Sequence, residues 1–170
     1  MTILTKTKIN QAIREGQITI TPPLLSDQIN GASIDLTLGN EFRLYNKRAG
    51  AIDVKETTNY RRYTTIHHTH SLLLHPQETI LGITREKITL PDNVVGWLEG
   101  RSRFARLGLL IHISAGLVHP GVNNHQVLEI TNLSPNILRL HAGTRICQLI
   151  LEQIDGTANY HGRYRTQTKP

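Results

Sequence analysis

One carboxylate stands inside an otherwise apolar run in the C-terminal half of the chain. Glu129 lies in the segment HQVLEITN, residues 125–132. If this segment is a β-strand, its side chains alternate between two faces. The face of Glu129 then carries His125, Val127 and Thr131, and the opposite face carries Gln126, Leu128 and Ile130. Periodicity alone favours solvent exposure for Glu129, but beside a phosphate-binding element the same carboxylate could transfer protons.

A group of cationic side chains follows the predicted strand at residues 94–99. The group consists of Arg101, Arg103 and Arg106, and the hydroxyl of Ser102 lies between the first two. A short helical turn capped by Ser102 would bring backbone N–H groups and guanidinium groups together, which suits phosphate oxygens. On such a turn Phe104 and Leu107 share a face that can pack inward. The alternative is an amphipathic turn with solvated arginines, and spacing does not separate the two.

Other polar residues favour structural or surface roles. Asp35 lies in the alternating segment ASIDLTLG, where structural hydrogen bonding is the favoured interpretation. His67, His68 and His70 have no cysteine or carboxylate at ligand spacing, which favours surface histidines over a metal site. Cys147 is the single cysteine, so an intrachain disulfide and a cysteine-cluster zinc site are excluded. Glycine-rich phosphate loops, the nucleophile elbow and the zinc-deaminase motif are absent from the sequence.

The elements that must position these residues are mostly short strands. Residues 5–17 predict one helix, with Ile9, Ala12 and Ile13 at helical spacing and Gly16 as its stop. Ten short apolar or alternating runs predict an all-β sandwich or barrel. They are residues 32–39, 41–46, 50–54, 71–76, 78–91, 93–100, 109–116, 125–132, 136–143 and 145–153. Residues 55–70 form either a long loop or a frayed strand pair.

Length and charge limit the classes of protein. With 170 residues and 38% hydrophobic content, the chain predicts a single domain with a real core. The formal charge of +6 indicates an anionic partner: nucleic acid, a membrane surface or a phosphorylated small molecule. No apolar run could span a membrane, and no signal peptide is recognisable, so we expect a cytoplasmic protein. The polar, basic tail orders only if something docks it.

Several separated motifs resemble those of the dCTP deaminase family within the dUTPase-like superfamily. They are INGASIDLTLG, VVGWLEGRSRFARLGLLIH, SAGLVHPG, QVLEITN and GRYRTQ, in the family's order. The resemblance implies a distorted β-barrel of the dUTPase type over residues 1–155, with a short N-terminal helix and a short helical turn near residues 102–107. It also implies a C-terminal flap, residues 156–170, and a homotrimer with active sites between subunits.

The resemblance further implies hydrolytic deamination of dCTP to dUTP and ammonia, in pyrimidine deoxynucleotide (dUMP and dTTP) synthesis. Mg²⁺ would bind through the substrate triphosphate, without zinc, and neither nucleic acid nor a membrane would be a partner. Glu129 inherits the role of general acid and base, with Ser102 and Arg106 nearest the base. The substrate-binding residues carried over are Arg101, Ser102, Arg103, Phe104, Ala105, Arg106, Ala115, His119, Val127, Leu128, Glu129, Tyr160, Arg163 and Gln167.

Departures from the family pattern keep two alternatives open. His119 stands where the family usually carries the aspartate that lies by the sugar 3′-hydroxyl and, in dUTP-hydrolysing relatives, activates water. Gly116, in contrast, resembles the bifunctional deaminase and diphosphatase enzymes that form dUMP. Arg103 replaces a serine, and Val122 stands where an aromatic residue is common. A non-enzymatic β-barrel that binds nucleic acid would explain the charge, but not the carboxylate in the strand.

Overall fold

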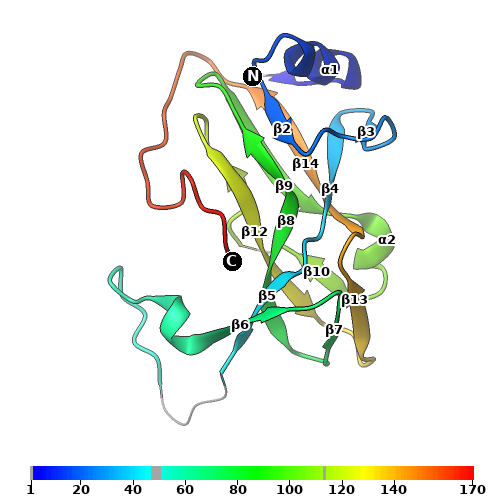
Figure 1. Ribbon diagram of the computed structural model, residues 1–170, viewed down its shortest axis with the longest axis vertical. Coiled ribbons are helices and arrows are strands. Elements are labelled where there is room, and N and C mark those ends of the chain that lie inside the picture. Colours follow the sequence, from blue (N-terminus) through cyan, green and yellow to red (C-terminus); the bar gives the residue numbers. More distant parts are fainter. Residues whose placement is uncertain (1, 47–50, 113) are drawn as a thin grey trace.

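The computed structural model describes residues 2–46, 51–112 and 114–170 and contains two six-stranded sheets and a small hairpin (Figure 1). The long neighbours pair antiparallel, β9 with β14 in the first sheet and β8 with β12 in the second. The first sheet contains β11 (Leu117–Val118), β9 (Val94–Gly100), β14 (Arg145–Gln153), β4 (Ser33–Thr37), β3 (Ile29–Asn30) and β1 (Thr2–Ile3). The second contains β10 (Leu109–Ile111), β12 (Asn123–Asn132), β8 (Thr79–Thr89), β5 (Glu41–Tyr45), β6 (Thr64–His68) and β2 (Thr19–Thr21). The hairpin pairs β7 (Ser71–Leu74) with β13 (Leu138–His141).

Among the described residues, three short helical segments accompany the strands. They are α1 (Lys6–Arg14), the 3-10 helix η1 (Tyr60–Tyr63) and α2 (Ser102–Ala105). Ile9 and Ala12 bury the apolar face of α1, and Gly16 follows the helix with a φ of 72°, a conformation that favours glycine. The predicted N-terminal helix is therefore confirmed. Within the described part of the chain, no helix has the length and apolar character needed to cross a membrane.

Both sheets contribute to one apolar core. Alternation along the strands turns every second side chain inward, which is why single aliphatic residues separated by polar ones are enough to form it. Fully buried contributors are Ile34, Leu36 and Leu149 from the first sheet and Phe42, Ile80, Leu128 and Ile130 from the second. The predicted all-β class is confirmed, with distorted sheets rather than flat ones, since β8 and β14 both carry register shifts.

Some predicted elements differ from the structure. Residues 51–54 form no strand, and residue 50 lies outside the described residues. Residues 55–70 combine both interpretations, since an exposed loop leads to η1 and then to β6. The short strands β1, β2, β3 and β11 were not predicted, because two or three residues carry no period. His67, His68 and His70 are exposed, as the surface interpretation predicted.

Candidate active site

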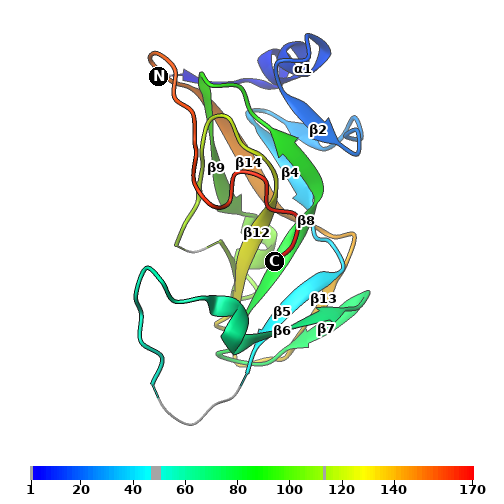
Figure 2. The ribbon, with the colours of Figure 1, turned by 60° about the vertical axis from the view of Figure 1, so that its left-hand side comes forward.

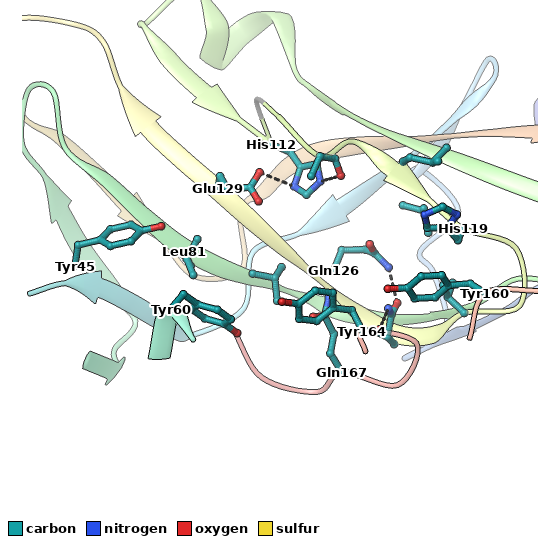
Figure 3. A pocket seen from close by; sticks show the side chains of 16 residues that line it. Tyr45, Tyr60, Leu81, His112, His119, Gln126, Glu129, Tyr160, Tyr164 and Gln167 are labelled. Atoms are coloured by element: carbon teal, nitrogen blue, oxygen red, sulfur yellow. Dashed lines mark hydrogen bonds and ion pairs between the residues drawn. The ribbon is translucent and has the colours of Figure 1, made fainter. Parts of the chain in front are cut away.

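A cavity of about 410 Å³ lies between β12, the loop after β10 and the C-terminal segment (Figure 3). Strand β12 contributes Asn124, Gln126, Val127 and Glu129; the loop contributes His112 and Ala115; the C-terminal segment contributes Tyr160, Tyr164 and Gln167. Tyr45 and Tyr60 line it from β5 and η1. The cavity therefore gathers side chains from segments more than 100 residues apart in the chain.

A register shift between β8 and β12 determines which side chains reach this cavity. His125 pairs with Lys87 but Val127 pairs with Ile83, so that residues 84–86 face Gln126 alone. The Gln126 backbone N–H donates to Thr84 Oγ1 (2.9 Å), outside the regular ladder. Gln126 lines the cavity together with Val127, and it is buried like Leu128 and Ile130, with which it was predicted to share a face.

Within the part of the chain that the structure describes, one carboxylate oxygen of Glu129 has no hydrogen-bond partner. Its side chain is 27% exposed, and its Oε2 is buried and 3.6 Å from His112 Nδ1, which also lacks a hydrogen bond. The His112 backbone N–H donates to the Glu129 carbonyl (2.7 Å), which continues the pairing of β10 with β12. The ladder thus holds the two side chains opposite each other, and sequence spacing gave no signal for this pair.

The hydrogen atoms of His112 follow from its partners. His112 Nε2 lies 2.7 Å from the Ala115 carbonyl oxygen, which can only accept, so Nε2 carries a hydrogen. Nδ1 then faces the Glu129 carboxylate either as a lone pair or as a second N–H. Nδ1 and Oε2 lie 3.6 Å apart, which is too far for a hydrogen bond, so neither atom is committed to another group of the described chain.

His112 adopts an unusual backbone conformation that aims its ring. Its φ is 56°, in the left-handed region that non-glycine residues rarely occupy. The turn brings the ring back over Ala115, and its side chain is 7% exposed. His112 is a site residue that the sequence analysis missed, although it ends the GRSRFARLGLLIH motif.

The pKa of Tyr45, which lines the cavity, is affected by Glu129. Burial raises the pKa of the Tyr45 hydroxyl, and the negative charges of Glu129 and Tyr60 raise it further. Tyr45 therefore remains a neutral hydrogen-bond donor near Glu129. The second effect shows that Tyr45 lies close enough to feel the charge of this carboxylate.

The C-terminal segment docks along the part of β12 that β10 leaves uncovered (Figure 2). Asn123 N–H donates to the Arg165 carbonyl (2.9 Å), and His125 N–H donates to the Gln167 carbonyl (3.1 Å). The side-chain Nε2 of Gln167 donates a hydrogen bond to the His125 carbonyl (3.2 Å). These backbone contacts explain how a tail without a core pattern becomes ordered. Its role as a flap stays a prediction.

His119 contacts the same segment. Its ring stacks on that of Tyr160, with centroids 4.6 Å apart and planes at 6°, and both residues line the cavity (Figure 3). The Tyr160 backbone N–H donates to the Pro120 carbonyl (3.1 Å). Among the described residues that line this cavity, Glu129 is the one carboxylate.

Helix α2 lies outside the Glu129 cavity. Ser102 and Ala105 line a second cavity of about 710 Å³, which His112 borders from the other side. The prediction that Ser102 caps the turn is wrong: Arg101 is the N-cap residue, and no side chain caps the helix. Phe104 packs on the core as predicted, whereas Leu107 is exposed.

Arg101 is held by a buried network. Its Nη2 pairs with Asp35 Oδ2 (2.9 Å), and its Nη1 donates to the Arg145 carbonyl (2.7 Å). Asp35 is 4% exposed, so its structural interpretation is confirmed.

A second buried carboxylate, that of Glu86, lies nearby. It accepts hydrogen bonds from Gln28 Nε2 (3.0 Å) and from the Thr37 N–H (2.8 Å). These bonds satisfy carboxylates that would otherwise be costly to bury.

Cys147 belongs to the same region of the core. It is fully buried, and burial, followed by the charges of Glu86 and Asp35, raises the pKa of its thiol. A protonated buried thiol is a weak nucleophile, so Cys147 has a packing role. Among the described residues, no group of three or more His, Cys, Asp or Glu side chains could hold a metal ion.

The predicted site residues thus fall into separate sets within one chain. The Glu129 cavity contains Ala115, His119, Val127, Glu129, Tyr160 and Gln167. Ser102 and Ala105 line the second cavity, and Arg163 lines a third. Those that line none of the three are Arg101, Arg103, Phe104, Arg106 and Leu128. Leu128 is fully buried in the core and can offer only its backbone.

Comparisons with known proteins extend over nearly the whole chain. A family model described as dCTP deaminase-like matches residues 3–154. An enzyme of Methanobrevibacter smithii named "dCTP deaminase, dUMP-forming" is 34% identical, with 100% of this chain and 93% of that protein covered. The dCTP deaminase of Tolumonas auensis is 39% identical, with 95% and 89% covered.

The fold agrees with the sequence comparisons. The crystal structure of 2′-deoxycytidine 5′-triphosphate deaminase from Agrobacterium tumefaciens matches with a TM-score of 0.69 at 18% identity. The match covers 88% of this chain and 47% of that chain, so this chain spans about half its length. Because the family model and relatives above 30% identity match almost end to end, the chain belongs to the dCTP deaminase-like family.

Proposed function

We propose that the protein deaminates dCTP hydrolytically, giving dUTP and ammonia. The observation that carries the proposal is the Glu129 carboxylate, whose Oε2 has no hydrogen-bond partner and faces His112 in a cavity. A carboxylate held this way can accept and donate protons without moving far. Deamination needs one such group, since a single carboxylate can pass the two protons of the attacking water first to N3 and then to the leaving amine.

The mechanism follows from this single carboxylate. Glu129 takes a proton from the water that attacks C4 of cytosine and delivers it to N3. The tetrahedral intermediate then loses ammonia, as Glu129 carries the second water proton to the amine and the C4 oxygen becomes the carbonyl of uracil. His112 positions the carboxylate through Nδ1, because its Nε2 is fixed on the Ala115 carbonyl. The backbone near Ala115, with Ser102 and Arg106, would orient the water and the base.

The complete site would need a second copy of the chain, and we propose the homotrimer of the family. Ser102 and Arg106 are exposed on and directly after α2, outside the Glu129 cavity, so one chain does not bring them to its own carboxylate. A neighbouring subunit could present its α2 to this cavity. Closed cyclic symmetry would then repeat the same contact at each interface.

The substrate would be the Mg²⁺ complex of dCTP in the cytoplasm. The cavity lining offers one carboxylate among its described residues, so the phosphates rather than side chains would hold the ion. We also propose that the triphosphate survives. His119 stands at the position where the family carries an aspartate, and its ring is stacked on Tyr160.

Product analysis tests the proposal directly. The protein would be incubated with dCTP and MgCl₂, and the nucleotides would be separated by chromatography while ammonia is measured. We expect dUTP and ammonia in equal amounts. Formation of dUMP and pyrophosphate would instead assign the dUMP-forming activity named for the Methanobrevibacter relative. Absence of turnover throughout the neutral pH range would refute deamination.

A further inference from the structure

A basic groove adjoins the Glu129 cavity. It has a volume of about 340 Å³ and lies between η1 with its preceding residue and the C-terminal segment. Three cationic side chains line it, Arg61 from η1 and Arg163 and Lys169 from the C-terminal segment. Its other lining residues are Asn59, Tyr60, Tyr164, Thr166, Gln167 and Thr168, all able to donate hydrogen bonds. No aspartate or glutamate is among the described residues that line it.

The three cations are uncommitted within the part of the chain that the structure describes. The ion pairs found there involve Lys55, Arg101 and Arg145, and the remaining contact of this kind joins His112 to Glu129. Arg61 lies with its guanidinium 5.8 Å from the centre of the Tyr60 ring, a contact that orients it while its N–H groups remain available. Like charges gathered without a counter-charge repel, so an anion placed among them would lower the free energy of the folded state.

The groove and the Glu129 cavity have lining residues in common. Tyr60, Tyr164 and Gln167 line both, and Figure 3 shows these three side chains grouped on the side of the cavity away from His112 and Glu129. A ligand that extends through both would meet the proton-transfer pair at one end and the cations at the other. A ligand that suits both ends carries a neutral, hydrogen-bonding group at one end and high negative charge at the other. A nucleoside triphosphate has both properties.

We propose that Arg61, which lies outside the family motifs, binds the terminal phosphates of the nucleotide whose base lies at Glu129. It would act beside Lys169 and Arg163, and the family resemblance already implies a substrate-binding role for Arg163. The inference rests on the proposed function and deepens it, because it makes the η1 segment a determinant of selectivity for triphosphates. Arginine suits this role, since its planar N–H groups bind two phosphate oxygens at once. Arg61 acts at a distance from Glu129 and therefore affects binding rather than the chemical step.

The test combines binding with kinetics. Inorganic tripolyphosphate is the probe, and its affinity would be measured by calorimetry for the full chain and for Arg61→Ala, Arg61→Lys and Arg139→Ala. Arg139 is an exposed arginine on β13 that lines none of the three cavities, so its variant removes the same charge elsewhere. We expect Arg61→Ala to weaken tripolyphosphate binding about tenfold, the effect of one lost charge-assisted contact, with a smaller loss for Arg61→Lys. Arg139→Ala should bind as the unmodified protein does.

Kinetics and competition distinguish the possible sources of phosphate. We expect Arg61→Ala to raise KM for dCTP about tenfold with little change in kcat, and to leave the affinity for deoxycytidine unchanged. Equal binding by Arg61→Ala and Arg139→Ala would refute the site. If tripolyphosphate binds at Arg61 but dCTP does not displace it, the groove serves another phosphate compound and the proposal is wrong. The binding measurement remains valid if the protein fails to deaminate dCTP, so the two failures are separable.

Discussion

Replacement of Glu129 by glutamine removes one charge and almost no volume, which makes it the sharpest test of the site. The Oε2 atom of Glu129 has no hydrogen-bond partner and lies 3.6 Å from His112 Nδ1. A glutamine amide at this position could donate to Nδ1 of a neutral His112, whose single hydrogen is held on Nε2 by the Ala115 carbonyl. The substitution is therefore compatible with the fold.

The expected magnitudes separate catalysis from stability. Loss of a general acid and base lowers kcat by about 100-fold or more, equal to about 2.7 kcal/mol of transition-state stabilisation. The free energy of unfolding should change by no more than about 1 kcal/mol, because a neutral hydrogen bond replaces an unsatisfied contact. Ammonia release measures the first quantity, and denaturant unfolding of the same preparation measures the second.

A matched substitution controls for the chemical change itself. Glu15 is exposed at the end of α1 and accepts a hydrogen bond from Gln11 (2.9 Å), far from the cavity in the fold. Glu15→Gln should leave both kcat and stability within error of the unmodified protein. If Glu129→Gln retains near-normal kcat while nucleotide binding is unchanged, Glu129 is not the proton-transfer group and the proposed mechanism is wrong.

Three further predictions follow. Asp35→Asn should destabilise the fold by about 3 kcal/mol in urea unfolding, because it breaks the buried pair with Arg101; a loss below about 0.5 kcal/mol would contradict this role. Burial, and then the charge of Glu129, raises the pKa of Tyr45, so Glu129→Gln should lower that pKa in tyrosinate absorbance titrations corrected with Tyr45→Phe; an unchanged value would refute the coupling. Because the pKa of Tyr45 is higher in the folded chain than in the unfolded chain, the unfolded chain loses this proton at a lower pH. Tyr45 therefore lowers the free energy of unfolding as the pH rises above about 10. Finally, the two single variants Ser102→Ala and Glu129→Gln would be unfolded, mixed in equal amounts and refolded. If each site takes Ser102 from one subunit and Glu129 from another, about a quarter of the sites are intact and about a quarter of the activity should return; if each site lies within one chain, the mixed trimers would remain inactive.

Alternation of apolar and polar residues was enough to predict most long strands. The runs around residues 78–91 and 145–153 became β8 and β14, because a two-residue period has one way to bury its apolar face. The N-terminal helix followed from the spacing of Ile9 and Ala12 and from Gly16. Very short strands escaped prediction because their pairing is set by neighbours, as for β11 on β9.

The sequence by itself determined that Glu129 is an acid in an otherwise apolar strand, and the family motifs suggested its role. Only the tertiary structure decided what faces it. The His112 ring reaches Glu129 because β10 pairs with β12 and because a left-handed residue turns the chain back, neither of which leaves a periodic signal. The structure likewise fixed Arg101 on Asp35 and joined η1 to the C-terminal segment around a basic groove. Contacts between segments distant in sequence depend on three-dimensional packing, which local patterns do not encode.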